Sequence, residues 1–279
     1  MTWENKDNPG IERILSVMAQ LRNPDGGCPW DLEQTYRTIA PYTIEEAYEV
    51  ADAIEKDDMA GLKEELGDLL LQVVFHSQMA TEENLFDFDS VAHGIADKMV
   101  RRHPHVFGDA SHRDAAEQTT AWEALKAEER AAKSDGKPAG ILDDIPAALP
   151  AATRALKLQK RAARVGFDWG DVQPVLDQMT EEIEELAAEL ATGKTGQEHP
   201  DPDRVEDEFG DLMFCVINLA RHLKVDPEAA LRRTNQKFER RFGHIEQTLR
   251  KDGKAMEQAS LDEMEALWQE AKMDERASD

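Results

Sequence analysis

One acidic pattern occurs twice in this chain, in the same order each time. A threonine stands just before Glu-Glu-x-x-Glu, and Glu-x-Gly-Asp-Leu follows further along the chain. The first copy begins at Thr43 and the second at Thr180. Self-similarity over this length predicts a repeated structural unit, and therefore two related halves.

The spacing of the acids places them on shared helix faces. Glu182 and Glu185 lie three residues apart, as do Glu208 and Asp211 on what we expect to be the next helix. If the two helices pack antiparallel, these carboxylates converge, which is costly unless a hard divalent cation such as Mg²⁺ binds them. The alternative to a metal site is an ordinary acidic helix surface exposed to solvent. Because the pattern occurs twice, we favour a metal site over an acidic surface. The first copy offers an equivalent set of candidate metal ligands: Glu45, Glu46, Glu49, Glu65 and Asp68.

A basic segment follows each acidic pair. Lys98 is followed by Arg101 and Arg102 in the first half, and Lys237 by Arg240 and Arg241 in the second. The order of two acidic helices and one basic helix, repeated, is hard to explain as surface decoration. It is typical of a site for an anion held through a metal.

Composition limits the partners and the compartment. The chain has 279 residues and a formal charge of −25, which argues against nucleic acid as a general partner. Its two cysteines predict no disulfide framework. The amino terminus has no apolar signal region, and no stretch approaches 18 uninterrupted apolar residues. We therefore expect a cytoplasmic protein with no membrane association.

The periodicity predicts an all-α fold, since no sustained period-two, β-branched run occurs. Breaker residues at 134–140 and the prolines at 146 and 150 predict two helical domains, 1–135 and 151–279, joined by a linker at 136–150. Residues 28–31 are expected to form a turn. The main expected helices are 11–21, about 42–57, 58–79, 87–103, 115–132, 156–164, 172–190, 204–223, 227–249 and 261–272.

Two further motifs are weak evidence for a metal site or a phosphate-binding loop. His103 and His105 flank a proline, which breaks helical spacing and favours a loop or helix-end role over a metal pair. The lone Gly-Lys-Thr at 193–195 lacks the upstream glycine of a Walker motif, because Ala188 stands there. No histidine has a glutamate three residues before it, which excludes the usual ferritin-like signature.

The doubled acidic motifs resemble those of the MazG family of all-α nucleoside triphosphate pyrophosphohydrolases. The resemblance covers nearly the whole chain, including Arg-Arg-His-Pro-His-Val-Phe at 101–107, Val-Gly-Phe-Asp-Trp at 165–169 and Lys-Phe-Glu-Arg-Arg-Phe at 237–242. It implies Mg²⁺-dependent hydrolysis, with Mn²⁺ as an alternative, of an NTP to NMP and diphosphate by a homodimer. It also implies that the second repeat is the active one.

The resemblance assigns roles by position. Glu182, Glu185, Glu208 and Asp211 would bind metal, with Glu181 placed to orient or activate water. The expected substrate-binding residues are Arg204, Asn235, Lys237, Arg240, Arg241 and Trp268. Chemically, cations four residues apart on one helix suit a departing diphosphate.

Several readings stay open at this point. Arg204 fits a salt bridge to Glu208 as well as it fits a phosphate, and Trp268 fits core packing as well as base stacking. Ala96 stands in the first repeat where the second has Asn235, which favours the second repeat as the working one.

Two other functions fit the same residues. One is a non-catalytic helical module that senses nucleotides and binds a partner protein. The other is a dUTP-specific diphosphatase of the same helical superfamily. We prefer broad NTP acceptance, since few base-reading groups are visible beyond Trp268.

Overall fold

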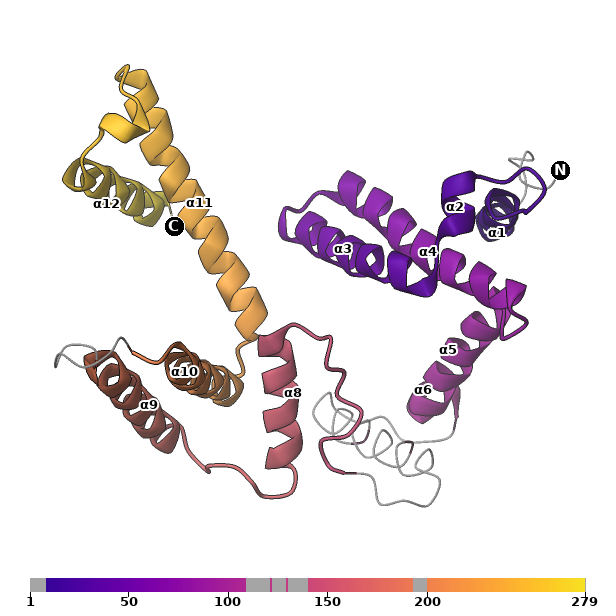
Figure 1. The fold of residues 1–279 in the computed structure, drawn as a ribbon, viewed down its shortest axis with the longest axis horizontal. Coiled ribbons are helices and arrows are strands. Elements are labelled where there is room, and N and C mark those ends of the chain that lie inside the picture. The colour runs from indigo at the N-terminus through magenta and orange to yellow at the C-terminus, as the bar shows by residue number, and fades with distance from the viewer. Residues whose placement is uncertain (1–8, 109–120, 122–128, 130–139, 193–199, 279) are drawn as a thin grey trace. The chain divides into compact units, whose positions relative to one another are not determined.

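The computed structural model describes residues 9–108, 121, 129, 140–192 and 200–278. The described residues form helices joined by turns, with no β-strand among them, which confirms the predicted all-α fold. The chain divides into two compact units, Met1–Lys133 and Ser134–Asp279 (Figure 1). The domain limits 1–135 and 151–279 and the linker 136–150 stay predictions, and the breaker stretch 134–139 and nearly all of the expected helix 115–132 lie outside the described residues.

The first unit is built around a helical hairpin. Helices α3 and α4 are joined by only three residues and pack along each other, while α1 and α5 pack on α4 (Figure 1). The elements of this unit are α1 (Gly10–Leu21), α2 (Pro29–Glu33), α3 (Tyr36–Glu55), α4 (Met59–Glu82), α5 (Phe88–Arg102) and α6 (Pro104–Phe107).

Local capping explains where these helices begin. The Asp58 carboxylate accepts from the Gly61 amide at 2.9 Å, and the Asp87 carboxylate from the Ser90 amide at 2.8 Å, as the sequence predicts. The expected start of α3 near residue 42 was wrong. Thr35 and Thr38 form a reciprocal capping box that starts the helix ahead of Pro41, which is held inside it. The expected turn at 28–31 is also wrong, since α2 begins there with a proline in its first turn.

The first unit has a continuous apolar core. Its fully buried members come from α1, α3 and α4, and each contributes on the order of 1.5–3 kcal/mol by leaving water. They are Met18, Ile39, Val74, Phe75 and Met79.

The second unit repeats the paired acidic helices. Helix α9 packs beside α10, α8 packs on α10 and contacts α11, and α11 pairs with α12 (Figure 1). The Asp226 carboxylate caps α11 by accepting from the Ala229 amide at 2.9 Å, as predicted. The elements of this unit are α8 (Ala151–Ala163), α9 (Gln173–Thr192), α10 (Pro202–His222), α11 (Pro227–Lys251), η1 (Met256–Gln258) and α12 (Leu261–Ser278). No helix in the described part of the chain is long and apolar enough to cross a membrane.

Candidate metal centre and phosphate-binding pocket

Three carboxylates meet where α9 packs against α10. Glu182 and Glu185 come from α9 and Glu208 from α10, and one oxygen of each lies within 4.8 Å of the others. Glu182 is only 8% exposed. Its Oε1 accepts a hydrogen bond of 2.8 Å from Nε2 of Gln178, one turn earlier on α9, which fixes the carboxylate. Gln178 was not among the residues predicted from the sequence, although its four-residue spacing from Glu182 is a signal that could have found it.

The electrostatics of this cluster suit a bound cation. Burial raises the pKa of Glu185, and the negative charges of Glu208, Glu182 and Glu181 raise it further. A divalent ion among these oxygens would remove that repulsion, and an all-oxygen ligand set is the kind that Mg²⁺ prefers. The residues therefore fit the expected metal.

Asp211 and Glu181 flank the three converging acids. Asp211 lies one turn beyond Glu208 on α10, and Glu181 precedes Glu182 on α9. Burial raises the pKa of the Cys215 thiol, and the charges of Glu182 and Asp211 add to the shift. Neither Asp211 nor Glu181 belongs to the set of oxygens within 4.8 Å.

The first unit contains a matching acidic cluster. Oxygens of Glu46 and Glu49 from α3 and of Glu65 from α4 also lie within 4.8 Å of one another. The pKa of Glu46 is raised first by burial and then by Asp68. Glu45 lies outside this set of three. Carboxylate geometry therefore does not distinguish the two repeats.

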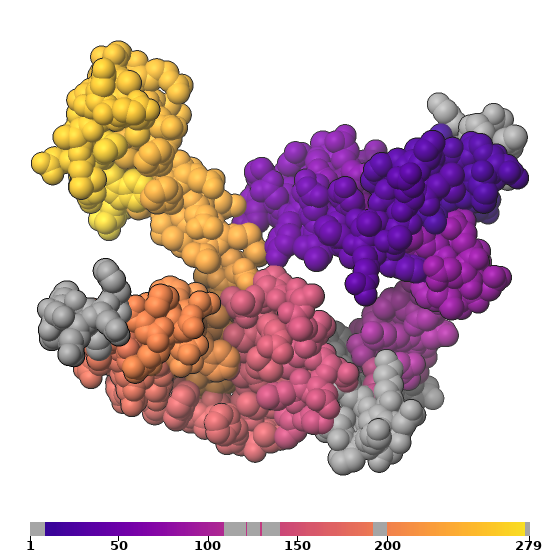
Figure 2. Space-filling view, viewed as in Figure 1, coloured from indigo at the N-terminus to yellow at the C-terminus, as the bar shows by residue number. Residues whose placement is uncertain are grey.

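The predicted phosphate-binding cations line a separate pocket of about 760 Å³ between α11 and α12. Helices α11 and α12 lie against each other near the carboxyl end of the chain, in yellow and gold in Figure 2. Its cations include two that the sequence analysis missed, Arg233 and Arg276. Arg233 lies one turn before Lys237, whereas Arg276 has no local signal. The full set of cations is Arg233, Lys237, Arg240, Arg241 and Arg276.

Arg241 is held in place from two sides. Its Nη2 lies 2.8 Å from Oε2 of Glu275, and its guanidinium lies 5.5 Å from the centroid of the Trp268 ring. Phe238 packs against Trp268 with ring centroids 5.3 Å apart. Arg240 also reaches Glu275, at 3.3 Å. In this arrangement Trp268 supports Arg241.

The remaining expected substrate contacts lie apart from this pocket. Arg204 forms a salt bridge with Glu189 of α9. The salt-bridge partner expected from the sequence was Glu208. Asn235 is exposed on α11. Among the described residues, none of Glu182, Glu185, Glu208 and Asp211 lines the pocket between α11 and α12.

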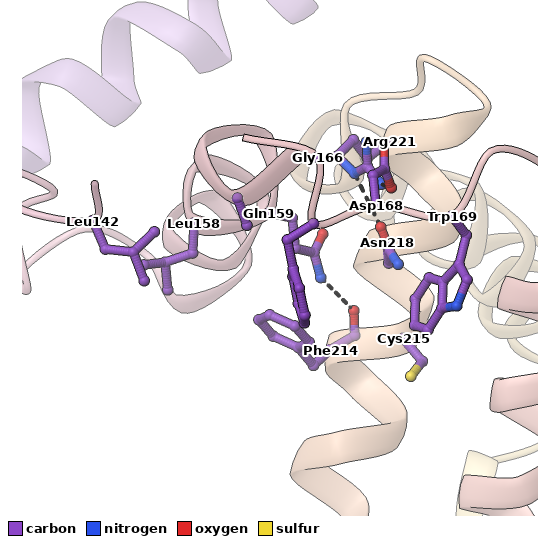
Figure 3. Close-up of a pocket in the computed structure, with 12 residues that line it drawn as sticks. Leu142, Leu158, Gln159, Gly166, Asp168, Trp169, Phe214, Cys215, Asn218 and Arg221 are labelled. Atoms are coloured by element: carbon purple, nitrogen blue, oxygen red, sulfur yellow. Dashed lines mark hydrogen bonds and ion pairs between the residues drawn. The ribbon is translucent and has the colours of Figure 1, made fainter. Parts of the chain in front are cut away.

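A third feature of the second unit is an apolar pocket of about 490 Å³ between α8, residues 166–169 and α10 (Figure 3). Cys215 lines it, as do Gln159 and Asn218, which the sequence analysis did not single out. No local spacing connects α8 to α10, so only packing reveals this pocket.

Paired acidic helices, present twice in an all-α chain, define the class of protein. The model of the MazG nucleotide pyrophosphohydrolase domain matches residues 34–107 and again residues 171–245, and the chain belongs to this family. Over 265 residues it is 50% identical to the nucleoside triphosphate pyrophosphohydrolase of Escherichia coli K12, which covers 95% of this chain and 98% of that protein.

Two further relatives have the same tandem extent. The nucleoside triphosphate pyrophosphohydrolase/pyrophosphatase MazG of Thermotoga maritima is 40% identical over 94% of this chain and 95% of its own length. The uncharacterized protein YabN of Bacillus subtilis is 43% identical over 94% of this chain, which spans 52% of YabN. At 94% or more of this chain, all three alignments extend over both of the ranges that the family model matches.

Proposed function

We propose that this protein is a Mg²⁺-dependent nucleoside triphosphate pyrophosphohydrolase, which converts NTP and water to NMP and diphosphate. The observation that carries the proposal is the convergence of Glu182, Glu185 and Glu208 from two helices. The names of the Escherichia coli and Thermotoga maritima relatives support the same reaction.

The residues suit the parts of such a reaction. Bound Mg²⁺, or Mn²⁺ in its place, would be held by Glu182, Glu185, Glu208 and Asp211, and it supplies charge neutralisation at the phosphates. Glu181 is the proposed group that orients the attacking water and accepts its proton.

The oxygen of that water bonds to the α-phosphorus while the bond from the α-phosphorus to the bridging oxygen breaks. Diphosphate leaves with the bridging oxygen. Lys237 and Arg241 stabilise its charge, and Arg204, Asn235 and Arg240 are further proposed phosphate contacts.

We propose a homodimer as the working form. The cations between α11 and α12 line a different pocket from the acids, so a second chain is a simple source of the missing partner for each. Large apolar side chains lie exposed on the acidic helices, as a covered interface requires, among them Ile183 on α9 and Phe209 on α10. Sedimentation or light scattering tests this directly, and a monomer under assay conditions contradicts it.

We further propose that the enzyme accepts a broad range of NTPs, that the second repeat is the active one, and that the protein is cytoplasmic. Both cysteines are free thiols, in keeping with a reducing compartment. A comparison of kcat/KM among ATP, GTP, CTP, UTP, dUTP and the other dNTPs separates a broad enzyme from a dUTP-specific one.

Product analysis tests the reaction itself. The protein is incubated with ATP, with and without Mg²⁺, beside Glu182→Gln. AMP and diphosphate from the wild type with Mg²⁺, lost in the variant, are the expected result. Release of orthophosphate contradicts the proposal. Tight Mg²⁺-dependent nucleotide binding without turnover of any NTP would indicate that the protein is a nucleotide sensor and not an enzyme.

A further inference from the structure

Glu275 of α12 forms a carboxylate bridge between two neighbouring arginines of α11. Its Oε2 accepts a hydrogen bond of 2.9 Å from Nε of Arg241 and lies 2.8 Å from Nη2 of the same guanidinium. Its Oε1 accepts a hydrogen bond of 3.3 Å from Nη2 of Arg240. The Arg241 side chain is 14% exposed and that of Arg240 is 61% exposed. One carboxylate therefore serves two cations, of which only Arg241 is mostly buried.

The first repeat contains the same kind of bridge, between Arg101 and Arg102 of α5. Oε1 of Glu129, a residue after α6, accepts from Nη2 of Arg101 at 2.7 Å, and Oε2 accepts from Nη2 of Arg102. The exposures match as well, since the Arg101 side chain is 58% exposed and that of Arg102 is 16% exposed. The hydrogen bonds from Arg102 and Arg101 lower the pKa of Glu129 to about 2. The bridge is therefore part of the repeated unit.

The sequence repeats the surroundings of this glutamate. A tryptophan followed by six residues and then Glu-Arg occurs at 268–276 and again at 122–130. On α12, Trp268 and Glu275 lie seven residues apart and share one face of the helix. Both contact Arg241, whose guanidinium lies 5.5 Å from the centroid of the tryptophan ring. Helix α12 thus holds one guanidinium through two side chains.

The cations of the pocket between α11 and α12 repel one another unless a carboxylate lies among them. Arg240 and Arg241 are adjacent in the chain, and three further cations line the same pocket. Glu275 offsets part of that repulsion. Because it takes the Nε and Nη2 edge of Arg241, it also sets the direction of the guanidinium plane. The pocket has five cations and two carboxylates, so it remains positive and still attracts a phosphate group.

We propose that Glu275 is a positioning residue for the hydrolytic step, which holds the Arg241 guanidinium in the orientation that meets the charge of the departing diphosphate. The inference rests on the function proposed above, in which Arg241 stabilises that charge. A guanidinium recognises phosphate through a planar fork of donors, so its direction decides how well it binds. The charge on the bridging oxygen develops in the transition state, and loss of orientation therefore lowers kcat more than it raises KM.

Two glutamine variants separate positioning of Arg241 from simple docking of α12 on α11. Glu275→Gln weakens the bridge in the repeat proposed to be active, and Glu129→Gln weakens the same bridge in the other repeat. We expect both variants to lower the melting temperature. Only Glu275→Gln lowers kcat for ATP, by about tenfold with KM within about twofold, the size of one charge-assisted hydrogen bond. An unchanged kcat in Glu275→Gln, or an equal loss of kcat in both variants, overturns the proposal.

A double-mutant cycle with Arg241→Ala tests whether Glu275 acts through Arg241. Once the arginine is removed, Glu275→Gln causes no further loss of kcat, because the group that it positions is absent. The single Arg241→Ala variant and the double variant are therefore expected to have the same kcat. Losses that add in the double variant would show that Glu275 acts on another group, and they overturn the proposal.

Isothermal titration calorimetry with inorganic diphosphate and Mg²⁺ gives a readout without turnover. We expect Glu275→Gln to raise the Kd for diphosphate about tenfold and Glu129→Gln to leave it unchanged. Equal or tighter binding by Glu275→Gln overturns the proposal, since tighter binding would mean that the carboxylate competes with the anion. A wild type that binds no diphosphate overturns it as well. If the wild type binds diphosphate but hydrolyses no NTP, the proposed function has failed and the Kd comparison alone decides the role of Glu275.

Discussion

Arg221 and Asp168 form a two-pronged ion pair that joins the end of α10 to the segment before α9. Nη1 of Arg221 donates to Oδ2 of Asp168 at 2.9 Å, and Nη2 donates to Oδ1. His222 lies 3.3 Å from the same carboxylate. The hydrogen bonds from Arg221 lower the pKa of Asp168, against the effect of burial.

We predict that Asp168→Asn destabilises the second unit by about 1.5–3 kcal/mol at neutral pH, because it breaks charge-assisted hydrogen bonds and leaves Arg221 unpaired. Since the folded-state pKa of Asp168 is lowered, its contribution is present above the unfolded-state pKa and is lost as pH falls toward the folded-state value. Thermal melts between pH 7 and pH 3 measure both effects. Asp207→Asn, on the exposed face of α10, is the control and should melt like the wild type.

One pair of substitutions tests which of the two repeats is the active one. Glu182→Gln should lower kcat at least about 100-fold, since even outer partners of metal ligands cost 10–100-fold when removed. Glu46→Gln, in the matching cluster, should leave turnover of ATP nearly unchanged. Diphosphate release under saturating Mg²⁺ measures both. The reverse pattern would move the active site to the first repeat.

Metal binding should depend on pH through the acidic cluster. Mg²⁺ at about 100 times its Kd should stabilise the protein by about 2.7 kcal/mol, and EDTA should reverse this. Because the pKa of Glu185 is raised by burial and by its acidic neighbours, protons compete with the metal, and Mg²⁺ affinity should fall as pH is lowered from 7 toward 5.

The sign of the metal-free behaviour is opposite to that of Asp168. A raised folded-state pKa makes the native protein bind more protons, so the contribution of Glu185 to stability improves as pH falls through that value. Melts with EDTA and with Mg²⁺ across this range distinguish the two effects. A Mg²⁺ stabilisation that is the same at pH 5 and pH 7 would contradict the prediction.

Lys237 and Arg241 should differ in what their removal does. Each alanine variant should lower kcat/KM by about 10- to 100-fold, because each loses a charge placed for the departing diphosphate. Arg241→Ala should also lower the melting temperature, since it loses Glu275 and the Trp268 ring. Lys237→Ala should not. Arg250→Ala, exposed in the last turn of α11, is the matched control for charge removal.

Helix faces and helix caps are the features of this fold that could be predicted from the sequence. The three-residue spacing of Glu182 and Glu185 fixes them on one face of α9, and Asp58, Asp87 and Asp226 cap the helices they were expected to cap. Helix periodicity and short-range capping depend only on neighbours in the chain. The beginning of α3 escaped prediction because the reciprocal box at Thr35 and Thr38 outweighs Pro41.

The sequence by itself determined an all-α chain with two repeats and the acids that would meet between paired helices. Tertiary structure alone decided which distant groups meet. It paired Arg204 with Glu189, set Arg241 over Trp268, and brought Gln159 to Phe214, 55 residues away. Helical spacing fixes the direction of a side chain on its own helix, but the partner it faces depends on how whole helices pack.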